Sequence, residues 1–386
     1  MIGKEEKKVQ YIELIYDLIF VYIIGRNNSL LHNLSGGFVE KEMLLAYVLC
    51  TLATIQIWSF TTFYINMFGT NGRRDHIFMF INMYLLYFMA EGTRRLWQSY
   101  GILNYAAWAL ILINIGMQYI IELKNHRADV WNRDIIKKIS IILFTEACII
   151  IAAAVSGGNF GVALSAAAIL FGIIFTTIGK NESADGMVDF AHLTERAMLY
   201  VVFTFGEMII AIASYFEGGD LNFNTIYFSV MAFLIVVGLF LSYGTFYDHL
   251  LNRETENNGL VYMLIHVGII FALNNITTAL EFMREEEVEI IPKMLFLVIS
   301  LVGYYALMFL LGRYAKNRCK PDMKFTLKIA ILAAGFVTLM IVFKNMMIIN
   351  IMLTVVFVFT AFLILSRFRC EKNFNEPKER GPKQND

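Results

Sequence analysis

Residues 192–216 read HLTERAMLYVVFTFGEMIIAIASYF and decide the fold class of this chain. The stretch offers about 20 mostly apolar residues, the length that an α-helix needs to cross the hydrocarbon core of a bilayer. It also contains His192, Glu195, Arg196 and Glu207. A charged group near the bilayer centre costs about 2.5–3.5 kcal/mol even on a lenient insertion scale. The stretch therefore predicts a membrane-spanning helix whose charges need partners.

Composition extends this interpretation to the whole chain. Hydrophobic residues make up 58% of the 386 positions and charged residues only 17%, and the mean hydropathy is +0.59. Apolar runs recur without a long hydrophilic block, so we expect one transmembrane domain, residues 1–386, with an all-α polytopic fold. Acidic residues lie among the first lysines and no A-x-A-like site follows, so we do not expect a cleaved signal peptide.

Apolar runs of about 18 to 24 residues predict a bundle of about twelve transmembrane helices. An even number of helices would place both ends of the chain on the same side of the membrane. The helices are expected near residues 9–27, 43–65, 76–95, 101–121, 139–156, 162–179, 193–216, 225–247, 259–283, 291–312, 325–343 and 346–366.

The distribution of lysine and arginine predicts the orientation, because basic loops are retained on the cytoplasmic side. With both termini inside, the inner segments hold 23 of these residues and the outer loops hold 7. We therefore expect cytoplasmic termini and a short basic cytoplasmic tail at residues 367–386. The net charge is zero, so the expected partners of the basic segments are lipid head groups, and nucleic acid is not an expected partner.

A short internal similarity indicates two halves, residues 9–179 and 193–366. Residues 62–66, TFYIN, and residues 245–249, TFYDH, fall at equivalent ends of the second and eighth predicted helices. Parallel repeats of this kind occur in secondary transporters, which bind their substrates where the repeats meet. The repeat would give the first and seventh helices equivalent positions near the boundary between the halves.

Helical spacing predicts which charges can meet. At about 100° per residue, the polar groups of residues 192–207 share one face. Arg196 and Glu207 lie about 16 Å apart along the helix, too far to pair with each other. Glu13 and Asp17 are four residues apart and repel each other unless a cation or a proton intervenes. We therefore expect Arg196 to contact both carboxylates across the boundary between the halves.

These considerations give a set of candidate residues for an intramembrane ion site. Groups near the cytoplasmic boundary can instead snorkel or form helix-end ion pairs. Titratable groups deeper in a helix are costly and usually face a cavity or a partner, and on this basis we expect Glu207 to face the protein interior. The candidates are Glu207, Asp17, His266, Glu13, Arg196, Glu195 and His192.

Other chemistries lack their sequence signatures. The chain contains no Walker loop and no GxGxxG, GxSxG or haem-attachment motif, so no cofactor and no catalytic residue is predicted. The four cysteines are far apart and form no CxxC pair. Zinc bound by His192 and His266 would be possible chemically, but no HExxH pair supports it, and no metal site is predicted.

Two segments carry a family resemblance. Residues 12–26, IELIYDLIFVYIIGR, resemble the ELFFDLVFV opening of the bacterial low temperature requirement protein A family. Residues 192–207, HLTERAMLYVVFTFGE, resemble that family's HLxERxxLxxxxxxGE motif. The matching positions are Glu13, Asp17, Phe20 and Arg26 in the first segment, and His192, Glu195, Arg196, Gly206 and Glu207 in the second.

The resemblance covers most of the chain, because Trp58, Asn66, Asp75 and His266 also fit the family pattern. The chain departs from it at Ile15 and Tyr16, where phenylalanines are usual, and at Met208, where a serine often follows the GE pair. The resemblance implies a protein of the bacterial cytoplasmic membrane with a role in growth at low temperature. It implies no particular substrate.

Three functions are consistent with these observations. The first is a secondary transporter or ion-conducting protein, in which Asp17, Glu207 and His266 form a titratable site for a small ion or proton and Arg196 holds the acidic groups. The second is an intramembrane lipid-modifying enzyme, which would use the same groups as acid and base. The third is a membrane sensor or scaffold. A polar cavity would favour transport, whereas fully paired charges would favour the scaffold; the sequence leaves the oligomeric state open.

Overall fold

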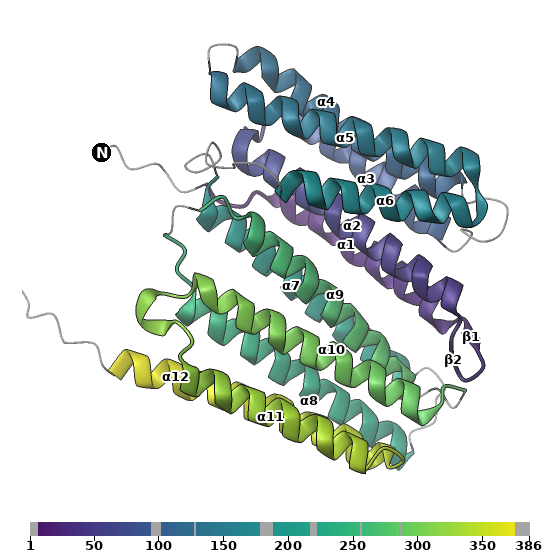
Figure 1. Cartoon of the computed structure of the whole chain (residues 1–386), viewed down its shortest axis with the longest axis vertical. Coiled ribbons are helices and arrows are strands. Elements are labelled where there is room, and N and C mark those ends of the chain that lie inside the picture. The colour runs from purple at the N-terminus through teal and green to yellow at the C-terminus, as the bar shows by residue number, and fades with distance from the viewer. Residues whose placement is uncertain are drawn as a thin grey trace, which may run out of the picture.

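The chain folds into a bundle of long α-helices (Figure 1). The computed structural model describes residues 7–374, apart from 94–101, 127–128, 178–187, 217–221, 255–256, 284 and 286. The described residues form α1 (Tyr11–Asn28), α2 (Lys41–Phe68), α3 (Arg73–Thr93), α4 (Ile102–Asn125), α5 (Val130–Ser156), α6 (Gly158–Thr177), α7 (Phe190–Ala213), α8 (Phe223–Thr245), α9 (Leu260–Phe282), α10 (Ile290–Leu311), α11 (Met323–Val342) and α12 (Met347–Phe374).

The twelve helices found within these ranges confirm the predicted fold class. Ten of them are long and apolar enough to cross a membrane by length and composition alone. The other two, α1 and α3, are the more polar ones: α1 holds Glu13, Asp17 and Arg26 within 18 residues. The closely spaced last pair of predicted helices is present as α11 and α12.

Short elements join some of the helices. A 3-10 turn, η1 (Ser29–His32), and a hairpin of β1 (Leu34–Ser35) and β2 (Phe38–Val39) connect α1 to α2. The α5–α6 connection is tighter still, because Gly157 and Gly158 adopt φ values of +61° and +53°. Glycine reaches this left-handed region without a Cβ clash, so α6 can begin immediately after α5.

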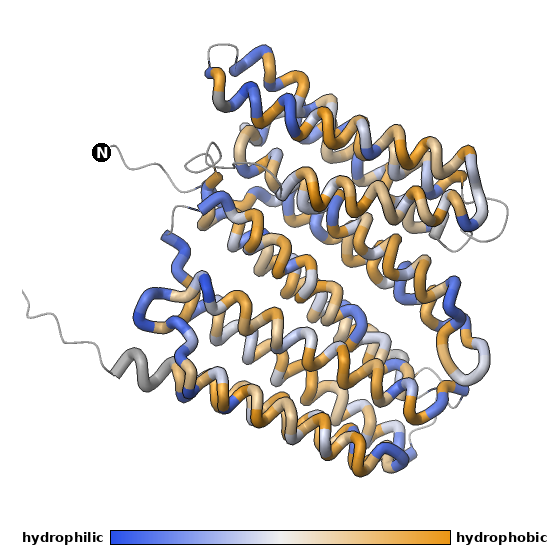
Figure 2. Tube along the Cα trace, viewed as in Figure 1, coloured by the Kyte–Doolittle hydropathy of each residue, from blue (hydrophilic) through white to orange (hydrophobic). Residues whose placement is uncertain are grey.

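The first six helices pack mainly with one another, and so do the last six (Figure 1). The two groups meet where α1 and α2 contact α7 and α9. The predicted equivalence of α1 and α7 agrees with their contact at this boundary, and the repeat itself stays a prediction. Polar residues gather at the two ends of the bundle and apolar ones between them (Figure 2), as expected for helices surrounded by lipid.

The start of α1 and the end of α12 lie on the same side of the bundle (Figure 1). Which side is cytoplasmic stays a prediction from the basic residues. Most of the predicted tail, residues 375–386, lies outside the described residues, as do positions 127 and 219, which belong to an inner and an outer connection in the predicted topology.

Candidate functional site

Arg196 on α7 forms the centre of a buried ion network. Its Nε and Nη2 donate hydrogen bonds to the Asp17 carboxylate at 3.1 and 2.6 Å, and its Nη1 donates to Glu13 Oε2. Arg196 and Asp17 are fully buried, and Glu13 is 2% exposed. The predicted contact of Arg196 with both carboxylates is confirmed. A guanidinium suits this task because its fork of donors can engage two carboxylates simultaneously.

Local helix geometry explains why these groups meet. Glu13 and Asp17 are four residues apart on α1, and His192 and Arg196 are four residues apart on α7, so each pair lies on one face of its helix. The two helices are in contact. Each face therefore presents two polar groups to the other across the boundary between the halves.

Helix α2 completes the network. Trp58 Nε1 donates to Asp17 Oδ1 at 2.8 Å, and Asn66 Nδ2 donates to His192 Nδ1 at 3.0 Å. His192 Nε2 lies 3.3 Å from Glu13 Oε2, an ion-pair distance without hydrogen-bond geometry. Trp58 and Asn66 are positions of the family pattern, and their side chains orient the charged groups.

The charges in this network do not balance by themselves. Two carboxylates face one guanidinium, so one negative charge remains within the network unless a proton or the nearby Lys7 ammonium compensates it. Leaving an uncompensated charge buried is strongly unfavourable. The network therefore needs a further positive charge, from a proton or from Lys7.

A polar cavity adjoins the network at the end of the bundle where α1 begins. Its volume is about 170 Å³, and Glu13 forms part of its wall, together with Gln10, Asn71, Asp75 and His76. Asn71 is exposed at the surface, so the cavity lies between Glu13 and the aqueous side of the bundle. Water in this cavity would have polar partners on several sides.

Lys7 lines the same cavity and fixes the chain entering α1. Its Nζ donates to the backbone carbonyls of Ile65 and Gly69 at the end of α2, the latter at 2.8 Å. Cations are favourable at helix carboxyl ends. Burial lowers the pKa of the Lys7 ammonium, although Glu13, Asp75 and Asp189 oppose this change.

Glu207 lies on the same helix as Arg196 but in different surroundings. It is half-buried, and its carboxylate faces α1: a Cβ added to Gly25 would lie 2.5 Å from Glu207 Oε1. No hydrogen bond or ion pair to Glu207 is found in the part of the chain that the structure describes. Another carboxylate, Glu281 of α9, lies close enough to act on it electrostatically.

His266 lies apart from both carboxylate sites. Its Nδ1–H donates to the Tyr262 carbonyl at 2.9 Å, and its Nε2 accepts from the Tyr243 hydroxyl at 3.0 Å. Both nitrogens are thus satisfied inside the second half. Among the described residues, Asp17, Glu207 and His266 share no hydrogen bond or ion pair, so they do not form one compact cluster. Glu195 is half-buried and takes no part in the Arg196 network.

Sequence reasoning missed a charged contact at the opposite end of the bundle. In His32 of η1, Nδ1 lies 2.5 Å from Glu285 Oε1 and Nε2 lies 3.2 Å from Glu281 Oε2. These contacts join the first half to the end of α9. A hydrogen bond to Glu281, and a second one to Glu285, raise the pKa of the His32 imidazole to about 10. No periodicity points to His32, because it lies in a connection between helices.

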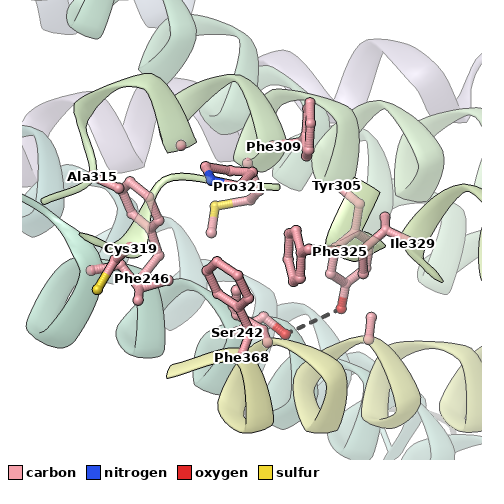
Figure 3. Close-up of a pocket in the computed structure, with 15 residues that line it drawn as sticks. Ser242, Phe246, Tyr305, Phe309, Ala315, Cys319, Pro321, Phe325, Ile329 and Phe368 are labelled. Atoms are coloured by element: carbon pink, nitrogen blue, oxygen red, sulfur yellow. Dashed lines mark hydrogen bonds between the residues drawn. The ribbon is translucent and has the colours of Figure 1, made fainter. Parts of the chain in front are cut away.

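An apolar pocket in the second half is separate from all of these groups (Figure 3). It has a volume of about 50 Å³ and lies among α8, α10, α11 and α12. The hydrogen bond between Ser242 and Tyr305 is the polar contact drawn there, at 3.3 Å. Such a lining suits packing or an acyl chain and offers no group for proton transfer. The described residues also contain no cluster of three His, Cys, Asp or Glu side chains suited to a metal ion.

The apolar helices and the buried ion network define a multi-pass helical membrane protein. The model of the bacterial low temperature requirement A protein family matches residues 8–361, and the chain belongs to this family. The match includes both motifs that supply the network. Neither the curated proteins nor the solved structures contain a significant match to this chain.

Proposed function

We propose that this protein is a proton-coupled secondary transporter or an ion-conducting protein of the bacterial cytoplasmic membrane. The observation that carries the proposal is the buried network of Glu13, Asp17, His192 and Arg196, in which two carboxylates face one guanidinium. Carriers of this kind need groups that change charge inside the membrane. The family relation adds the expectation of a role in growth at low temperature.

The cavity beside Glu13 supports a route for the proton. A carboxylate on the wall of a polar cavity can exchange protons with water that enters from the aqueous side. Arg196 then keeps Asp17 and Glu13 in place in either protonation state.

Glu207 is the proposed proton carrier on the far side of this network. It lies eleven residues beyond Arg196, about 16 Å along α7, and has no cationic partner among the described residues. His266 and Glu195 belong to the candidate set, and in this proposal they act from the second half and not by direct contact with Asp17 or Glu207. A small ion or a proton is the proposed partner.

The alternatives make different demands. A lipid-modifying enzyme would use Glu and His as acid and base, and it would require a nucleophile beside them. A scaffold would need only the ion pairs of Arg196. The unpaired Glu207 and the cavity beside Glu13 favour transport over both.

Orientation is part of the proposal. Tags at residue 127 and at the carboxyl terminus should both report the cytoplasm, and a tag near residue 219 should report the exterior, because basic residues are concentrated in the inner segments. Finding residue 127 and the carboxyl terminus on opposite sides would overturn the twelve-helix topology.

The decisive experiment measures flux in proteoliposomes with a pH-sensitive dye and a panel of ions. Glu207→Gln keeps shape and hydrogen bonding but removes titration, so we expect a folded protein whose flux is lost or no longer depends on pH. Glu42→Gln, at an exposed carboxylate in the first turn of α2, is the matched control and should behave as the wild type. Full flux with an unchanged pH dependence in Glu207→Gln would contradict the role of Glu207.

A further inference from the structure

Another buried carboxyl group lies within the first half and plays no part in the proposed mechanism. Glu146, in the middle of α5, has no exposed surface. Its Oε2 accepts one long hydrogen bond, 3.4 Å, from Gln56 Nε2 of α2, and its Oε1 has no hydrogen-bond partner in the described part of the chain. This pair differs from the Arg196 network, where strong donors surround each carboxylate.

Among the described residues, no charge compensates Glu146. Helix α6, packed against α5, has no ionisable side chain, and α2 presents the neutral Gln56. Helix α4 also packs against α5, and its acidic residue, Glu122, is paired with Arg74. An isolated carboxylate in such a place is so costly that the group takes up a proton instead.

The amide of Gln56 is suited to both protonation states. Its Nε2 also approaches the Ile169 carbonyl at 3.4 Å, and its Oε1 is buried without a partner. The amide nitrogen donates to a carboxylate, as in the present arrangement. Rotation of the amide by half a turn would bring Oε1 to the carboxyl group, where it can accept the O–H of a carboxylic acid.

Gly172 of α6 makes this close arrangement possible. A Cβ at this position would lie 2.5 Å from Glu146 Oε2 and would overlap Gln56 Nε2. The three helices therefore converge on the carboxyl group, and an alanine could not be accommodated without moving the pair.

Gln56 also lines a groove between the halves. Its walls come from α2 and α6 of the first half and α9 of the second, and its volume is about 80 Å³. A cavity of about 190 Å³ shares Phe60, Phe63, Thr176 and Leu260 with it and extends to Asp134 at the start of α5. The amide of Gln56 thus lies between Glu146 and a groove that adjoins the cavity extending to Asp134.

We propose that Glu146 and Gln56 form a second proton-binding site, which exchanges its proton through the groove between α2, α6 and α9. The bound state is a carboxylic acid whose O–H is donated to Gln56 Oε1. On release, the proton passes to water in the groove, and the carboxylate that remains accepts from Gln56 Nε2. The site does not depend on the Arg196 network and does not require that the protein transports anything.

The test uses dicyclohexylcarbodiimide, an apolar reagent that modifies protonated carboxyl groups, on the full-length protein in membrane vesicles. Peptide mapping should find the adduct at Glu146, decreasing as the pH rises and lost in Glu146→Gln. Glu122 is equally buried but paired with Arg74, so it is the internal control and should stay unmodified. Absence of the adduct at Glu146 at every pH would overturn the proposal.

Two further variants keep the test informative if Glu146→Gln does not fold. Gln56→Leu removes the donor to the carboxylate while keeping the volume, so modification of Glu146 should persist to higher pH than in the wild type. Met263→Trp would narrow the groove from α9 and should slow the modification. An unchanged pH dependence in Gln56→Leu would exclude the amide as the partner, and an unchanged rate in Met263→Trp would exclude the groove as the route.

Discussion

The two ends of α7 hold charged groups in opposite surroundings. At its start, Arg196 is fully buried and bound to Glu13 and Asp17 of α1. Eleven residues later, Glu207 approaches Gly25 of the same neighbouring helix and has no ion pair in the described part of the chain. The comparison shows that charged groups on one membrane helix can have different structural roles. The partner of each group decides whether it anchors two helices or stays free to titrate.

The largest loss of stability is expected when the ion network around Arg196 is broken. Arg196→Met would leave two carboxylates buried without a cation, and removing one partner of a buried pair costs about 3–5 kcal/mol. Thermal unfolding in detergent, followed by size-exclusion chromatography, should show a clear loss of stability. A triple variant, Glu13→Gln with Asp17→Asn and Arg196→Met, should recover much of it, since no charge remains buried.

The control for this prediction is Arg26→Met. Arg26 pairs with Glu91 at 2.9 Å, but both side chains are about a third exposed, 28% and 36%. Pairs of this kind contribute about 0–1 kcal/mol. Equal losses for Arg26→Met and Arg196→Met would mean that the buried network is no stronger than a surface ion pair.

A smaller effect is expected at the contact that joins η1 to the end of α9. The pKa of His32 rises from 6.5 to about 10 through Glu281 and Glu285, so the protonated ring stabilises the fold fully below about pH 6.5. This contribution is lost as the pH rises through about 10. His32→Gln should therefore lower the unfolding temperature at pH 6 but hardly at pH 10.5. A difference that stays constant with pH would mean that His32 acts by packing alone.

Substitution of two glycines is expected to change stability least. One of the two substitutions tests the position of the Glu207 carboxylate directly. In Gly25→Ala the new Cβ would displace the Glu207 carboxylate, whereas in Gly206→Ala it would meet nothing within 4 Å. Both changes should alter stability by no more than about 1 kcal/mol. Only Gly25→Ala should impair flux in the proteoliposome assay. Equal flux in the two variants would show that the position of Glu207 against α1 does not matter.

Much of the fold could be predicted from local patterns. Long apolar runs gave the helices because backbone groups in lipid must be satisfied within each segment. The contact of Arg196 with Glu13 and Asp17 was also predictable, since spacing of four residues places both carboxylates on one face and like charges need a cation. Helix α1 carries several charged residues for a helix surrounded by lipid. Its contact with α7 explains how this polarity is tolerated.

Other features followed no local pattern. Glu146 was visible as a carboxylate in the fifth predicted helix, but Gln56 lies 90 residues earlier and is a common packing residue in membrane helices. His32 and Glu285 are separated by 253 positions. His266 and Glu281 both lie on α9, yet His266 bonds to Tyr243 and Tyr262 within the second half.

The sequence by itself determined the class of this protein, a multi-pass helical bundle, and the pair of motifs that meet at Arg196. Those properties depend on composition and on the spacing of residues along single helices, which are fixed by the chain. The tertiary structure alone decided which carboxyl groups are paired and which are not. Pairing depends on how each helix is rotated against its neighbours, and that rotation is set by packing among many side chains. Glu13 and Asp17 thus became parts of an ion network, whereas Glu207 and Glu146 have no ion pair among the described residues.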